Sequence, residues 1–170
     1  MNHVRTSQVY KKKSAPMKIF LVEDSAAVRE RLVAMVSELR GAEIVGYAED
    51  ARRATEYVVA FQPDVVILDI QLSGGSGMEV LREVKRLQPS PVVIMLTNYA
   101  TPEYRLACRQ AGAELFLDKS FEAEQLVDIL RGMIRQLGVV PPVIPFARRR
   151  RSLRVDQSMV HRVITGSSQR

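Results

Sequence analysis

The middle of the chain alternates short apolar runs with segments whose apolar residues recur every three or four positions. The apolar runs stand at 18–22, 43–48, 65–68, 92–96 and 115–117. Several are apolar at consecutive positions, which is typical of strands buried on both faces of a parallel sheet. A segment with helical spacing follows each run. This alternation predicts an α/β fold in which helices cover both faces of an open, doubly wound, five-stranded parallel sheet.

The helical segments carry start and stop signals. Asp24 or Ser25 can cap the first, and Thr101-Pro102 opens the fourth with a cap followed by a proline. Pro63 and Pro89 end the second and third, because the residue before a proline is driven out of the helical region. The fifth has the clearest apolar stripe: Leu126, Ile129, Leu130, Met133, Ile134 and Leu137. Five strands joined by right-handed crossovers favour the flavodoxin-like strand order 2-1-3-4-5.

Charge divides the 170 residues into three parts. Residues 1–16 carry four Lys/Arg and no acid, residues 17–138 carry 14 basic and 18 acidic residues, and residues 139–170 carry seven and one. We expect a basic, flexible N-terminal segment over 1–16 and one folded domain over 17–138. Residues 139–170 combine a proline-containing linker at 141–145 with the block Arg148 to Arg151, and are expected to be disordered.

Composition excludes several classes of protein. No apolar stretch approaches the roughly 20 residues needed to cross a bilayer, and the first residues lack the apolar core of a secretory signal. We therefore expect a cytoplasmic protein without a membrane partner. The single Cys108 excludes an internal disulfide and every zinc site that needs two thiolates. Neither His3 nor His161 has another candidate ligand nearby in sequence, so a metal site would be built from oxygen.

Polar side chains follow four of the five predicted strands. Glu23-Asp24 ends the first, Asp69 the third, Thr97 the fourth, and Asp118-Lys119 the fifth. In an open parallel sheet, ligands bind where strands present their carboxyl ends. The converging carboxylates would repel one another even with a lysine beside them. A hard divalent cation resolves this repulsion, and Mg²⁺ suits the site because it uses one or two carboxylates and keeps waters that a phosphate oxygen can replace.

This set resembles the receiver domain of two-component response regulators, of the single-domain chemotaxis type, over about residues 17–138. The resemblance is carried by Glu23-Asp24, the run Val65-Val66-Ile67-Leu68-Asp69, Gly77, Thr97 and Lys119. It implies that Asp69 accepts a phosphoryl group from a sensor histidine kinase or a phosphotransfer protein. It also implies that Asp24, Asp69 and the backbone carbonyl of Gln71 bind Mg²⁺ directly, with Glu23 reaching the ion through water.

The resemblance assigns further roles around Asp69. Lys119 would pair with one phosphoryl oxygen, and the Thr97 hydroxyl would donate to another. Phe116 stands where the family has an aromatic switch residue. The output face would be formed by the fourth helix, the fifth strand and the fifth helix, and would bind a downstream protein or a second copy of the chain. On this interpretation the chain is a phosphoprotein switch and not a turnover enzyme.

Departures from the family pattern leave alternatives open. Ser73 stands where the family commonly has a proline. Ser120 stands where the family usually has a proline that follows a cis peptide bond. Asn98 is bulkier than the small residue that usually follows Thr97. Ser120 and Asn98 favour, as an alternative, a degenerate receiver that works as a phosphorylation-independent binding module.

The basic tail favours a third interpretation, a transcriptional regulator that binds DNA through Arg148 to Arg151. The 32 residues after Gly138 are too few for a winged-helix domain. A phosphohydrolase of the haloacid dehalogenase class would need an Asp-x-Asp motif after the first strand, and Glu23-Asp24-Ser25-Ala26 does not supply it.

Two further features have simpler interpretations. The run at 74–77 lacks the spacing of a phosphate-binding loop and is predicted to be a flexible loop. Cys108 is expected to be a small buried residue of the fourth helix, with no neighbouring charge to activate it. The resemblance to the receiver family also implies that Tyr99 and Gln71 flank the site, where they would either tune removal of the phosphoryl group by water or form loop surface.

Overall fold

The structure, a computed structural model, describes residues 15–137. Residues 1–14 of the expected basic segment at 1–16, and the expected linker and tail at 139–170, therefore lie outside the described residues. Five parallel strands form one sheet in the spatial order β2-β1-β3-β6-β7. This is the predicted flavodoxin-like order, because two short strands, β4 and β5, fall between β3 and β6 in the chain. The sheet strands are β1 (Met17–Val22), β2 (Ala42–Ala48), β3 (Val65–Leu68), β6 (Val92–Thr97) and β7 (Leu115–Asp118).

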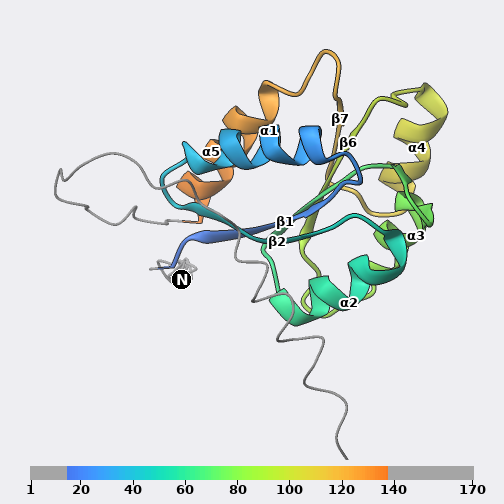
Figure 1. The fold of residues 1–170 in the computed structure, drawn as a ribbon, viewed down its shortest axis with the longest axis horizontal. Helices are drawn as coiled ribbons and strands as arrows, with labels where there is room; N and C mark the ends of the chain where they lie inside the picture. The colour runs from blue at the N-terminus through green and yellow to red at the C-terminus, as the bar shows by residue number, and fades with distance from the viewer. Residues whose placement is uncertain (1–14, 138–170) are drawn as a thin grey trace, which may run out of the picture.

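Helices cover both faces of the sheet, as Figure 1 shows. One layer contains α1 (Ala26–Ser37) and α5 (Gln125–Gln136). The other contains α2 (Ala51–Phe61), α3 (Gly77–Val84) and α4 (Pro102–Gln110). Among the described residues, no helix is long and apolar enough to cross a membrane.

The core is divided into two halves by the sheet. All four residues of β3 are buried, and alternate residues belong to opposite halves. Val66 and Leu68 pack with α2, α3 and Cys108 of α4. Val65 and Ile67 pack with the apolar sides of α1 and α5. The consecutive apolar residues of the sequence are thus explained by burial on two faces.

Helix ends follow their capping residues in most cases. The Ser25 side chain accepts a hydrogen bond from the Val28 amide, and Thr101 accepts one from Tyr104, with Pro102 in the first turn of α4. The predicted end of α3 is wrong, because the helix stops at Val84 although the apolar spacing continues to Leu87. The Leu87 amide bonds to the carbonyl of Val84, three residues back, so the backbone tightens beyond the α-helix.

The glycine-containing run after β3 has more structure than the predicted loop. β4 (Gln71–Leu72) and β5 (Gly75–Ser76) form a short antiparallel pair. Gly74 lies in the turn between them with φ +75°, a backbone conformation that other residues rarely adopt. The Gly77 amide then donates to the carbonyl of Ile70, which fixes the start of α3 next to the end of β3.

Candidate functional site

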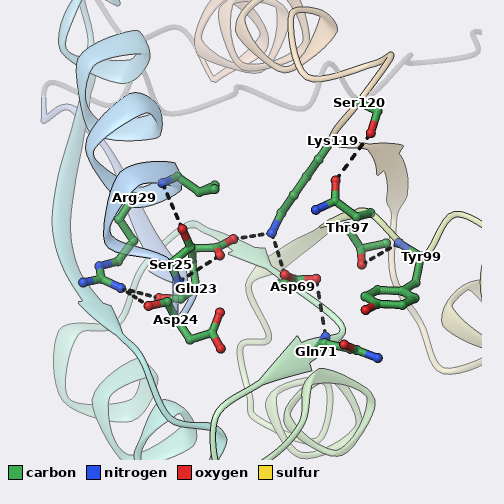
Figure 2. A network of polar contacts seen from close by, with 12 residues as sticks. Glu23, Asp24, Ser25, Arg29, Asp69, Gln71, Thr97, Tyr99, Lys119 and Ser120 are labelled. Atoms are coloured by element: carbon green, nitrogen blue, oxygen red, sulfur yellow. Dashed lines mark hydrogen bonds and ion pairs between the residues drawn. The ribbon is translucent and has the colours of Figure 1, made fainter.

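Lys119 joins two acidic residues at the carboxyl ends of the sheet strands. Its Nζ donates to Glu23 Oε2 and to Asp69 Oδ2, both at 2.5 Å. Glu23 follows β1, Asp69 follows β3 and Lys119 follows β7, so the fold brings together residues up to 96 positions apart. Figure 2 shows the lysine side chain reaching between the two carboxylates.

This group is largely removed from solvent. Glu23 is 3% exposed and Asp69 is 7% exposed, and the Lys119 side chain is 10% exposed. Buried charges require close partners because water no longer solvates them. Here two carboxylates share one ammonium, which leaves the three side chains with a surplus of one negative charge.

The Asp69 carboxylate is held by both of its oxygens. While Oδ2 accepts from Lys119, Oδ1 accepts from the backbone amide of Gln71 at 3.4 Å. Gln71 is the first residue of β4, and its side chain is exposed. The turn after β3 therefore fixes the direction in which the carboxylate points.

Thr97 is the last residue of β6 and is fully buried. Its Oγ1 accepts a hydrogen bond from the Tyr99 amide at 3.2 Å. The Lys119 amide donates to the Thr97 carbonyl, so the ends of β6 and β7 are joined beside the site. Because the hydroxyl oxygen is the acceptor in the contact with Tyr99, its own proton remains to be donated.

Asp24 is placed differently from Glu23. It is exposed, and its Oδ2 accepts a hydrogen bond from Ser73 Oγ at 3.0 Å. Within residues 15–137, no three His, Cys, Asp or Glu side chains are grouped closely enough to hold a metal ion. The ammonium of Lys119 lies between Glu23 and Asp69, and Ser73 holds the third carboxylate.

Arg29 supports the acidic pair and was missed by the sequence analysis. Its Nη1 donates to the backbone carbonyls of Glu23 and Asp24, both at 2.9 Å. Its Nη2 pairs with Glu49, and its guanidinium lies 4.9 Å from the ring centre of Tyr47. A basic residue in the second turn of a helix that starts just after an acidic pair is the signal that could have identified it.

Phe116 contacts a second arginine, Arg105, which the sequence analysis did not identify. The Arg105 guanidinium of α4 lies 4.8 Å from the ring centre and donates to the Phe116 carbonyl. Its other nitrogen pairs with Glu122 at 2.8 Å. This hydrogen bond and one from the Asp118 amide lower the pKa of Glu122 below its ordinary value. Arg105 thus connects α4, β7 and the loop before α5.

The bond between Lys119 and Ser120 is trans, since Gln88-Pro89 is the one cis peptide in the described part of the chain. The Ser120 amide donates to Asp118 Oδ1 at 2.7 Å, and the Ser120 hydroxyl contacts the Asn98 side chain at 3.5 Å. Lys119 therefore reaches both carboxylates with serine after it.

Cys108 lies apart from this site. It is fully buried, as expected, with its Sγ 3.2 Å from Met78 Sδ. Burial raises the pKa of its thiol, and this opposes formation of the nucleophilic thiolate.

Comparisons with known proteins identify the same family as the site residues. The family profile of the response regulator receiver domain matches residues 19–131. The chain is 33% identical over 122 residues to the phosphate regulon transcriptional regulatory protein PhoB of Pseudomonas aeruginosa, covering 71% of this chain and 52% of that protein. It is 32% identical over 108 residues to protein-glutamate methylesterase/protein-glutamine glutaminase 4 of Hahella chejuensis, covering 63% and 28%.

Solved structures agree with these relatives. The response regulator domain of Thermotoga maritima CheB superposes with a TM-score of 0.62 at 27% identity, covering 74% of this chain and 99% of that one. The chain spans between about a quarter and two thirds of the length of the curated relatives it matches.

Proposed function

Since the chain belongs to the response regulator receiver family, we propose that Asp69 accepts a phosphoryl group from a sensor histidine kinase or a phosphotransfer protein. The observation that carries the proposal is the bridge from Lys119 to Asp69 and Glu23 at the carboxyl ends of the strands. It provides a buried carboxylate nucleophile with a cation already beside it.

The residues of the chain have distinct roles in this transfer. An oxygen of Asp69 attacks phosphorus while the bond from phosphorus to the donor imidazole breaks, and the electron pair of that bond stays on the imidazole nitrogen. The Lys119 ammonium then transfers its contact from the Asp69 carboxylate to a phosphoryl oxygen. Thr97 donates its proton to a second phosphoryl oxygen. Positioning and charge neutralisation supply most of the catalysis in phosphoryl transfer.

The chain offers Mg²⁺ the kind of donor it prefers, although the candidate carboxylates would have to regroup around the ion, because no three of them among residues 15–137 are close enough to hold it as they stand. All of these donors are oxygens, and the group of Glu23, Asp69 and Lys119 carries surplus negative charge. Asp24, Asp69 and the Gln71 carbonyl would hold the ion, and Glu23 would reach it through water. When bound, Mg²⁺ draws charge from the phosphoryl oxygens. Asp24 would exchange its hydrogen bond with Ser73 for this role.

The output of the switch is altered binding to another protein through α4, β7 and α5. Tyr104 and Leu106 of α4 are 36% and 48% exposed, which offers apolar contact area. Arg105, between them, clamps Phe116. Thr97 is the last residue of β6, and Lys119 follows β7. A movement of these two residues would therefore be transmitted to this face through the two strands. The receiver has no turnover activity of its own in this proposal.

Binding of beryllofluoride, a phosphoryl mimic, tests the proposal against the alternative of a degenerate binding module. With Mg²⁺ present, we expect beryllofluoride to shift the backbone amide resonances of Thr97, Lys119 and α4 beyond any shift that Mg²⁺ alone produces. The shifts should vanish in Asp69→Asn and persist in Asp64→Asn, a matched change at the opposite end of the sheet. A native chain that shows no response to the mimic would establish the degenerate module instead.

A further inference from the structure

A groove lies at the end of the sheet opposite Asp69, where β3 and β6 begin. Its volume is about 660 Å³. Residues before and at the start of β3 and β6 line it, together with residues at the end of α5. Its apolar lining includes Pro63, Val65, Val92, Met133 and Leu137, and Asp64, Ser90 and Gln136 also line it.

The groove surface is mostly apolar. Three prolines line it, and Leu137 at its rim is 39% exposed. Its volume is in the range of sites that enclose whole ligands, about 300–1,000 Å³. Apolar surface left in water is unfavourable, so an apolar occupant that covers it would be stabilising.

We propose that residues 139–146 of the same chain occupy this groove. Leu137, the last described residue, is itself part of the lining, so the following segment starts at the groove. That segment, Val139-Val140-Pro141-Pro142-Val143-Ile144-Pro145-Phe146, contains no polar or charged side chain. It ends shortly before the arginine block begins at Arg148. The inference does not rest on phosphorylation of Asp69.

The backbone of the segment suits an apolar site. Three of its eight residues are prolines, which have no N–H group to leave unpaired when buried. Prolines also favour the extended polyproline conformation, in which eight residues span about 25 Å. Because such a segment is already stiff, it loses little conformational entropy on docking.

The connection between groove and segment favours docking within one chain. A short connection gives an effective concentration in the millimolar range, so weak contacts suffice. Gly138, the only residue between Leu137 and the segment, can adopt the left-handed conformation that reverses a chain at a helix end. The segment can therefore turn back across the end of α5.

Nuclear Overhauser effects in the full chain test this inference. We expect contacts from the Met133 methyl group to the methyl groups of Val143 or Ile144. They should be lost in Val143→Asp/Ile144→Asp, and the Met133 methyl resonance should shift. The matched control, Val163→Asp/Ile164→Asp, changes the same residue types further along the tail and should leave the Met133 resonance in place.

Two outcomes would overturn the inference. The first is an absence of these contacts, together with a Met133 resonance that both double variants leave unchanged. The second is that the contacts appear only between differently labelled chains in a mixed sample, which would assign the groove to a second copy. Unchanged resonances around Asp69 in both variants would show that the domain remains folded.

Discussion

At the scale of single residues, the candidate site depends on the ammonium of Lys119. It is the cation that contacts both Glu23 and Asp69, and all three side chains are at most 10% exposed. Removing one partner of a buried ion pair leaves the other charge uncompensated, which costs more than the intact pair contributes. The lysine is therefore important for stability as well as for phosphoryl transfer.

We expect Lys119→Met to lower the free energy of unfolding by about 3–5 kcal/mol, because two buried carboxylates would then repel each other. Urea denaturation followed by circular dichroism measures this loss. Adding Glu23→Gln should restore part of it, since one charge is removed. The control Arg131→Met breaks an exposed pair with Asp128 and should cost under about 0.5 kcal/mol. Equal losses in Lys119→Met and the control would contradict the proposed role.

The pair of Arg105 and Glu122 gives a prediction for pH dependence. The pKa of Glu122 lies below its ordinary value of 4.5, first because of the Arg105 hydrogen bond. Folding thus favours the charged carboxylate, so the stabilisation is complete above pH 4.5 and disappears as the pH falls through the lowered pKa.

Arg105→Met should accordingly raise the pKa of Glu122 towards 4.5. The variant should lose more stability above that pH than in acid, and this pH-dependent part should be under about 1 kcal/mol because the pair is partly exposed. The contacts of Arg105 with Phe116 are lost at every pH and add a loss that does not change with pH. Carbon-detected titration of the Glu122 carboxyl group and unfolding at several pH values provide the measurements. If Arg105→Met left the pKa of Glu122 unchanged, the Arg105 hydrogen bond would be ruled out as the cause of the lowered pKa.

At the scale of secondary-structure elements, the sequence predicted the features that follow from a regular spacing of apolar residues. It did not predict individual hydrogen bonds between segments that are distant in the chain. The apolar residues of β3 predicted a strand buried on two faces, and Thr101-Pro102 predicted the start of α4. Parallel strands also dictate that residues following β1, β3 and β7 meet at one end of the sheet. The hydrogen bond between Ser73 and Asp24 could not be predicted, because it depends on where the β4–β5 hairpin meets another loop.

The spacing of apolar residues also predicted a wrong helix end at the point where the backbone leaves the α-helical conformation. The apolar position Leu87 fits a longer α3, but the chain leaves the α-helix after Val84. Arg29 and Arg105 were missed for a related reason. Each arginine bonds to an acidic side chain and to backbone carbonyls from other elements, and the choice of these partners depends on the fold.

The junction between β3 and α3 depends on Gly77. A Cβ atom at this position would lie 1.8 Å from the carbonyl oxygen of Asp69, whereas one at Gly132 of α5 would meet nothing within 4 Å. We expect Gly77→Ala to lower the free energy of unfolding by about 1–3 kcal/mol or more and to displace Asp69. Gly132→Ala should instead raise it by about 0.5–1 kcal/mol through helix propensity. Thermal denaturation of both variants checks the contrast, and a neutral Gly77→Ala would refute it.

At the scale of the whole molecule, the two ends of the sheet differ in chemistry. The carboxyl ends of the strands carry a buried acidic group with one lysine, and the opposite end carries an apolar groove beside the last turn of α5. Charge at the first end suits a phosphoryl group and a cation, and apolar surface at the other suits a segment of protein chain. The sheet separates the two, so a chemical change at one need not disturb the other.

The central claim is that Asp69 is the phosphoacceptor, and labelling by a small phosphodonor tests it most directly. The full chain, Asp69→Asn and Asp64→Asn are each incubated with acetyl phosphate, with and without Mg²⁺, and their intact masses are measured. The account predicts the mass of one added phosphoryl group in the native chain and in Asp64→Asn when Mg²⁺ is present, and none in Asp69→Asn. Undiminished labelling of Asp69→Asn would contradict it.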